Sequence, residues 1–124
     1  MASTLLSPTI QDPVYNCNNI ADETLTAWHL VKRTATGVAL AGAGVDVYGV
    51  VVSDAASAAY TEVATDATLD TCECSVTVTK GEAVKSATGG KIATASSADT
   101  ACGIAEQTGT NTYITFRPLT FKAA

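Results

Sequence analysis

One succession of residues occurs twice in this chain, and the repetition limits the fold more than any other feature of the sequence. Each copy predicts a strand, a Gly-containing turn, a second strand, an Asp-containing turn and a Gly-led apolar strand. A unit this short cannot bury its apolar face alone, so we expect two similar β-modules that pack together. The matching segments are 30–33, 37–41 and 46–51 within residues 28–52, and 83–86, 90–95 and 99–105 within residues 82–105.

The whole pattern predicts an all-β domain over residues 27–124, built as a small antiparallel β-barrel or sandwich with at most one short helix. Residues 72–79 alternate between apolar and polar side chains, which is typical of one half-buried strand. Residues 113–117 alternate in the same way, and Pro118 predicts that this last strand lies at a sheet edge. Two interpretations of the Ala-rich stretch 53–71 stay open: a short helix over residues 54–60, or a long loop.

Residues 1–26 differ from the rest of the chain, because they contain two prolines and an Asn-rich cluster without a regular apolar period. We interpret this segment as an extended N-terminal arm. It is more apolar and less charged than a disordered tail. We therefore expect it to dock, either on its own domain or on a neighbouring subunit.

The composition favours contact with other proteins. Charged residues make up 15% of the chain, against about 25% in an average soluble domain, so much of the surface is neutral and easily desolvated. The net charge is −5, and no basic residue lies between Arg33 and Lys80, which argues against nucleic-acid binding. We expect neither a cleaved signal nor a membrane-spanning segment, since the start lacks a basic and apolar leader and no long apolar run occurs. The cysteines are then expected to stay reduced, and disulfides stay open for assembled particles that meet oxidising surroundings.

The cysteines and the single histidine supply the groups that zinc binds in proteins. Two of the cysteines, however, share the apolar side of the strand predicted over residues 72–79, which favours ordinary buried thiols. The histidine lies between apolar neighbours and is interpreted as a structural residue. The residues of this hypothetical zinc site are Cys17, His29, Cys72, Cys74 and Cys102.

No motif indicates catalysis or a cofactor, because the sequence lacks a nucleophile elbow, a phosphate loop and a dinucleotide fingerprint. The acidic run from Asp46 to Glu73 lacks the spacing of a calcium loop and is expected to face solvent. We therefore expect no enzyme activity, no metal and no cofactor.

The segments 83–85, 90–95, 99–105 and 113–117 follow one another in an order that resembles the small β-rich capsid decoration, or cement, proteins of tailed bacteriophages, including the lambda-like head decoration type. The resemblance implies a non-enzymatic protein that joins the outside of an icosahedral head after expansion and clamps neighbouring major capsid subunits. It also implies a homo-oligomer, with a trimer favoured, and an extended N-terminal arm. Such a protein is made in the host cytoplasm and ends on the capsid exterior.

With this resemblance, the apolar residues of the arm are predicted to contact the major capsid protein, with main-chain pairing to a sheet edge as one form of the contact. Deletion of residues 1–20 is then expected to abolish head binding while the domain stays folded. The predicted contact residues are Leu5, Leu6, Ile10, Val14 and Tyr15.

Two other functions stay open. One is a β-domain of a fibre, tail or pilus-like surface structure that recognises a receptor or glycan, for which Trp28, Tyr48, Tyr60 and Tyr113 should gather in one groove. The other is a small enzyme or metal protein built around the histidine and the cysteines. Less than about 0.1 equivalent of zinc in the purified chain would exclude the metal protein.

Overall fold

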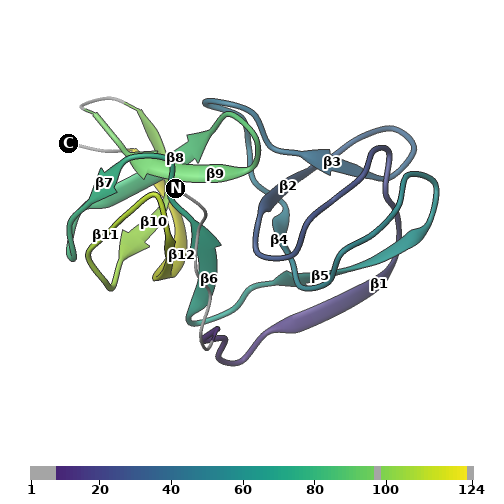
Figure 1. The fold of residues 1–124 in the computed structure, drawn as a ribbon, viewed down its shortest axis with the longest axis horizontal. Coiled ribbons are helices and arrows are strands. Elements are labelled where there is room, and N and C mark those ends of the chain that lie inside the picture. The colour runs from purple at the N-terminus through teal and green to yellow at the C-terminus, as the bar shows by residue number, and fades with distance from the viewer. Residues whose placement is uncertain (1–7, 97–98, 123–124) are drawn as a thin grey trace.

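The protein consists of two β-lobes that lie side by side (Figure 1). The computed structural model describes residues 8–96 and 99–122, with side chains as far as residue 119. The described chain is all-β, in antiparallel sheets and without a helix, so the predicted fold class is confirmed. None of it is a helix long and apolar enough to cross a membrane.

The first lobe, here called the first module, holds a five-stranded sheet in the order β1-β5-β4-β2-β3. The second module holds a five-stranded sheet in the order β6-β12-β10-β8-β9 and a small sheet of β7 and β11. The strands of the first module are β1 (Val14–Ile20), β2 (Leu30–Arg33), β3 (Val38–Leu40), β4 (Gly49–Val51) and β5 (Tyr60–Thr65). Those of the second are β6 (Asp70–Glu73), β7 (Thr77–Val78), β8 (Ala83–Ala87), β9 (Lys91–Thr94), β10 (Thr100–Ala105), β11 (Gly109–Thr110) and β12 (Tyr113–Lys122).

The two large sheets have the same topology. Strands β1 to β5 correspond in turn to β6, β8, β9, β10 and β12, and this substitution turns one strand order into the other. The pairing register also agrees, because Val31 lies opposite Gly49 in the first module and Val84 lies opposite Gly103 in the second. The residues that repeat in the sequence therefore hold matching places in the two sheets.

Gly49 and Gly103 recur because neither position has room for a side chain. A Cβ atom on Gly49 would lie 2.4 Å from the backbone oxygen of Ala64, and one on Gly103 would lie 2.5 Å from the backbone oxygen of Arg117. Both distances are far below van der Waals contact. A glycine in this strand lets the neighbouring backbone approach closely in each module.

The modules stack with one face of the first sheet against the interior of the second module. Val31 and Val51 point into the core of the first module, whereas their neighbours Leu30 and Val50 belong to the core of the second. This division follows from the strand, in which successive side chains point to opposite faces. Burial of a side chain such as Leu30 is worth about 1.5–3 kcal/mol, so the joint contributes substantially to stability.

Main-chain hydrogen bonds also cross the joint. The N–H of Leu30 donates to the carbonyl of Gly90 at 2.6 Å, and the N–H of Gly90 donates to the carbonyl of Ala41 at 2.9 Å. A Cβ atom on Gly90 would lie 2.7 Å from the Leu30 oxygen, and its φ of +74° is left-handed. The turn between β8 and β9 therefore requires glycine where it meets the first module.

The strand predicted over residues 72–79 is interrupted. Strand β6 ends at Glu73 and β7 begins at Thr77, with a bend at residues 75–76. Cys72, Cys74 and Val78 are buried as the alternation predicted, but Val76 is 45% exposed. The bend forms where the N–H of Ser75 donates to the Ile92 carbonyl at 2.9 Å, and this draws the chain away from β12.

The last strand is longer than predicted and does not lie at an edge, because β12 sits between β6 and β10. Its pairing with β6 covers only residues 113–116, so Pro118 faces a single neighbour. A register shift between Ala101 and Gly103 lies beside this proline. A bulge with one partner strand accepts a residue that has no N–H to donate.

The Ala-rich segment before β5 is a loop, not a helix. Leu25 and Ala55 exchange backbone hydrogen bonds at 2.8 and 2.9 Å, and Ala58 turns the chain with a φ of 71°. The helix is therefore wrong, and the long loop is correct only for residues 53–59, because β5 occupies residues 60–65 and β6 begins at Asp70. The loop covers the core of the first module.

Candidate functional site

Part of the predicted arm is a strand. Residues 14–20 form β1, which pairs with β5 of its own module, while Leu5 and Leu6 lie outside the described residues. Just before β1, the N–H of Gln11 donates to the Leu69 carbonyl at 2.9 Å, and Ile10 is half-buried. The described part of the segment thus docks on its own domain. Deletion of residues 1–20 would remove a strand of the sheet, so substitutions in β1 are a cleaner test of contact.

Strand β1 is the most open edge of the two large sheets. It ends the strand order of the first sheet, and its seven residues include no charged side chain. The opposite edge, β3, has only three residues, and the edge β9 carries Lys91. Proteins usually protect edge strands by shortness, charge or cover. Ala21, directly after β1, bridges Val38 of β3, so the main-chain groups available to a partner are those along residues 14–19.

Three exposed apolar side chains lie on one face beside this edge, and we call them the β1–β5 patch: Tyr15, Ile20 and Tyr60. Their exposed fractions are 49%, 36% and 72%. Ile20 lies opposite Tyr60, and Tyr15 lies opposite Ala64, which has the same parity as Tyr60 along β5. The register therefore places all three on the same face. Val14, 52% exposed, points to the other face.

The surroundings of the patch are acidic. Asp12 precedes β1, Asp22 and Glu23 follow it, and no Lys or Arg occurs before Lys32. Hydrogen bonds from Thr34 and Thr36 lower the pKa of Asp22, so its carboxylate stays ionised.

At the centre of β1, the exposed thiol of Cys17 donates to the Glu62 carboxylate at 3.3 Å, and this bond is the main reason why the pKa of Cys17 is raised. Glu62 thereby lies in the middle of the patch. The site therefore combines an open strand, apolar side chains and negative charge.

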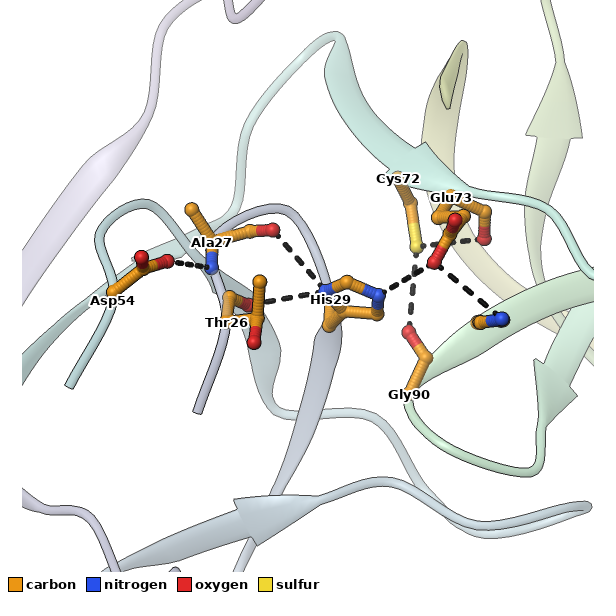
Figure 2. Close-up of polar contacts among 8 residues, drawn as sticks. Thr26, Ala27, His29, Asp54, Cys72, Glu73 and Gly90 are labelled. Atoms are coloured by element: carbon orange, nitrogen blue, oxygen red, sulfur yellow. Dashed lines mark hydrogen bonds and ion pairs between the residues drawn. The ribbon is translucent and has the colours of Figure 1, made fainter. Parts of the chain in front are cut away.

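His29 forms a polar joint between the modules, as Figure 2 shows. Its Nε2 lies 2.8 Å from Glu73 Oε1, and its Nδ1 lies 3.1 Å from the carbonyl oxygens of both Thr26 and Ala27. Carbonyl and carboxylate oxygens only accept hydrogen bonds, so each ring nitrogen faces an acceptor. Lys91 Nζ lies 3.5 Å from the same Glu73 oxygen. This group joins β2 to β6 and β9.

The cysteines and the histidine do not assemble into one site. Cys72 and Cys74 are buried in the second module, whereas Cys17 is exposed on β1. Burial raises the pKa of Cys72 well above its usual range and that of Cys102 to about 12, which keeps these thiols protonated and unreactive. Within the described ranges, no three His, Cys, Asp or Glu residues are grouped so that they could hold a metal ion.

The four aromatic residues considered for glycan recognition are dispersed. Tyr60 is exposed at the edge of the first module, while Tyr48 lies under Arg33, whose Cζ is 4.6 Å from the ring centroid. Tyr113 meets the His29 ring edge-on at 6.3 Å. Trp28 is half-buried against the core of the second module. They form no common groove.

A cavity of about 360 Å³ lies at the joint, lined among others by Leu30, Val50, Phe116 and Asp70. The prediction that the acidic run faces solvent is wrong for Asp70, which is 1% exposed. The carboxylate accepts a hydrogen bond from the N–H of Thr71 at 2.8 Å, yet burial raises its pKa to about 7. Asp70 lies opposite Phe116 and so shares the inner face of the second sheet.

Sequence reasoning did not include Ile20 among the contact residues and assigned Tyr60 only to the glycan groove, because the strand pairing alone brings the two together. Asp70 carried a usable signal, since it has the same parity as the apolar-side residues Cys72 and Cys74. Extending the alternation by one step would have placed this carboxylate on the buried face.

No family model matches the chain, and no curated protein matches its sequence. In structure it is similar to the N base of the head fibre protein gp8.5 of bacteriophage phi29, determined by crystallography, with a TM-score of 0.73 and 14% identity. The alignment covers 90% of this chain and 97% of that chain, so both modules take part. At this identity the likeness establishes a shared fold.

Proposed function

We propose that the protein is a non-enzymatic structural component of a phage virion, bound to the outer surface of the head, where it stabilises contacts between major capsid subunits. The observation that carries the proposal is the shared fold of both modules with a phage head fibre base. The order of residues in the C-terminal third, which resembles capsid decoration proteins, supports the same location.

The surface of the molecule suits this role. Strand β1 offers an uncharged edge and exposed apolar side chains, while Cys72 and Cys74 of the second module are buried. A shell presents many equivalent junctions, so weak contacts made by many copies add up to a stable network. A trimer would place several β1 edges around one junction, and the mass of the free protein in solution tests this oligomeric state.

A second candidate function is the base of a fibre, and the identity of the structural neighbour favours it. A fibre base attaches a further element to the head and does not need to strengthen the shell. A cement protein, in contrast, should raise the resistance of the head to heat.

The experiment mixes the purified protein with undecorated expanded heads of the phage that encodes it. For a cement protein we expect saturable binding to the outer surface and release of DNA at a higher temperature than in bare heads. Binding without any change in the release temperature would favour the fibre base. Absence of binding would contradict both functions.

A further inference from the structure

We infer that β1 is the docking edge of the protein, and that it binds an extended, basic segment of the shell protein as an additional strand of the first sheet. The inference rests on the proposed function, because the shell supplies the partner. It specifies the strand that makes contact, the mode of pairing and the charge of the bound segment.

The main chain of β1 is open where the matching strand of the second module is covered. Beside β6, Thr71 Oγ1 donates to the Thr9 carbonyl at 2.9 Å, and the N–H of Glu73 donates to the Trp28 carbonyl at 3.2 Å. The chain thus covers one edge with its own segments. At its C-terminal end β1 meets β3, because Ala21 bridges Val38 and the N–H of Asp22 donates to the Val38 carbonyl at 2.8 Å. No strand of the described chain pairs with the outer edge along residues 14–19, which leaves this part for strand addition.

The β1–β5 patch supplies side-chain contacts for an added strand. Tyr15 and Ile20 lie on the docking strand itself, and Tyr60 extends the same face inward along β5. Tyrosine is among the residues that most often dominate binding energy at interfaces, because it buries a large rigid ring and keeps a polar end. Apolar side chains at alternate positions of the bound segment would pack on this face.

The charge around β1 selects a basic partner. Carboxylates flank the strand at both ends and Glu62 lies at its centre, whereas no Lys or Arg occurs in residues 1–31. Lys or Arg side chains of the bound segment would meet these carboxylates, which favours the correct partner and speeds association.

A second copy of the chain fits the edge poorly. In an antiparallel pair of two β1 strands, Asp12 of one copy would lie near Asp22 and Glu23 of the other, and like charges would repel. The bulge between Asn16 and Asn19 also bends the edge, which hinders pairing between two identical strands. The chain's own residues 1–7 contain no basic side chain and so lack the favoured charge.

The test uses the full-length protein and undecorated expanded heads, with binding measured by cosedimentation. Tyr15→Lys and Tyr60→Lys each place a positive charge in the patch, and each should weaken binding at least about tenfold. Val76→Lys is the matched control, since Val76 is 45% exposed on the second module, and its Kd should stay within about twofold of wild type. Thermal unfolding by circular dichroism verifies that each variant is folded.

The thiol of Cys17 gives a second measurement that needs no substitution. It is the exposed cysteine at the centre of β1, whereas Cys72 and Cys74 are buried. A strand added to β1 should slow its reaction with a maleimide at least about tenfold when heads are present, as mapped by peptide mass. Binding should also weaken as salt rises, because opposite charges are screened.

Each contrary result has a definite meaning. If all three variants bind heads as tightly as the wild type and Cys17 stays reactive in the presence of heads, β1 is not the docking edge. The proposed function would be unaffected by this result. Failure of the wild type to bind heads would overturn both. If the free protein self-associates and Tyr15→Lys abolishes the association, β1 binds a second copy of the chain. If Cys17 is protected in the free protein and deletion of residues 1–7 removes the protection, β1 binds the chain's own N-terminal residues. Either result would overturn the inference.

Discussion

Replacement of the buried carboxylate Asp70 by Asn should stabilise the protein at neutral pH and leave it unchanged in acid. Asp70 is 1% exposed at the joint cavity, and burial raises its pKa from 3.8 to about 7. The fold therefore retains a proton that the unfolded chain releases. Asn should keep the acceptor oxygen for the N–H of Thr71, and Asn16 already stands at the matching position of the first module.

The magnitude follows from linkage. Below about pH 3 both states are protonated and the group contributes no penalty. As pH rises from about 4 to about 7 the unfolded chain loses its proton first, so the free energy of unfolding falls by about 1.4 kcal/mol per pH unit. The total by pH 7 is about 4 kcal/mol, an upper bound because water entry and relaxation reduce it.

Urea denaturation of wild type and Asp70→Asn at five values between pH 4 and pH 8 measures this effect. We expect a difference below about 1 kcal/mol at pH 4 and an advantage of about 2–4 kcal/mol for the variant at pH 8. Asp66→Asn is the control, because Asp66 is exposed, and its difference from wild type should be small at every pH. A difference between wild type and Asp70→Asn that does not change with pH, or a variant that is less stable at pH 8, would refute the reasoning.

Three further predictions concern the stability of the two modules. Gly49→Ala and Gly103→Ala should each lower the free energy of unfolding, measured with urea, by more than about 2 kcal/mol, because a Cβ atom would clash with a neighbouring backbone. Gly42→Ala is the control and should change this free energy little, because its Cβ atom would meet no atom within 4 Å. An equal loss in all three variants would contradict this explanation. Glu73→Ala should cost about 2–4 kcal/mol because it removes the carboxylate that pairs with His29 across the joint, and a loss below about 0.5 kcal/mol would show that the pair is dispensable. Strong reductant should leave the thermal transition unchanged because the four cysteines are free, and a large decrease would reveal a disulfide.

The first and second modules could be matched from the sequence only where packing dictates the residue. Gly49 and Gly103 match because both meet a backbone oxygen, and Val31 and Val84 match because both are buried opposite those glycines. The correspondence of β1 with β6 has no such signal. One edge is exposed and the other is covered, so different residues are favoured in each.

The alternation of apolar and polar residues does not predict where a strand is interrupted or where it loses a neighbour. Alternation over residues 72–79 predicts the burial of Cys72, Cys74 and Val78 correctly and that of Val76 wrongly. The bend at residues 75–76 leaves no sign in the pattern, because the buried residues on either side of it keep the same parity. Pro118 indicates a sheet edge, and the part of β12 that contains it pairs with β10 alone. Residues 113–116 of the same strand also pair with β6, so this part is not at an edge.

The site could be predicted only in part. Val14 and Tyr15 were found as apolar residues in a segment without helix or strand period, and the structure places them on an open strand. Tyr60 joins them through the fold alone, since 45 residues separate it from Tyr15. Asp12, Asp22 and Glu23 are plain in the sequence, but only the strand pairing brings Glu62 to the centre of the same edge.

The central claim, that this two-module protein binds the outside of a phage head, is tested most directly by imaging. Purified protein mixed with undecorated expanded heads and viewed by electron cryomicroscopy should give two-lobed density on the outer surface at junctions between major capsid subunits, with the β1 side against the shell. Heads that remain bare at saturating protein, or density confined to the interior, would contradict it.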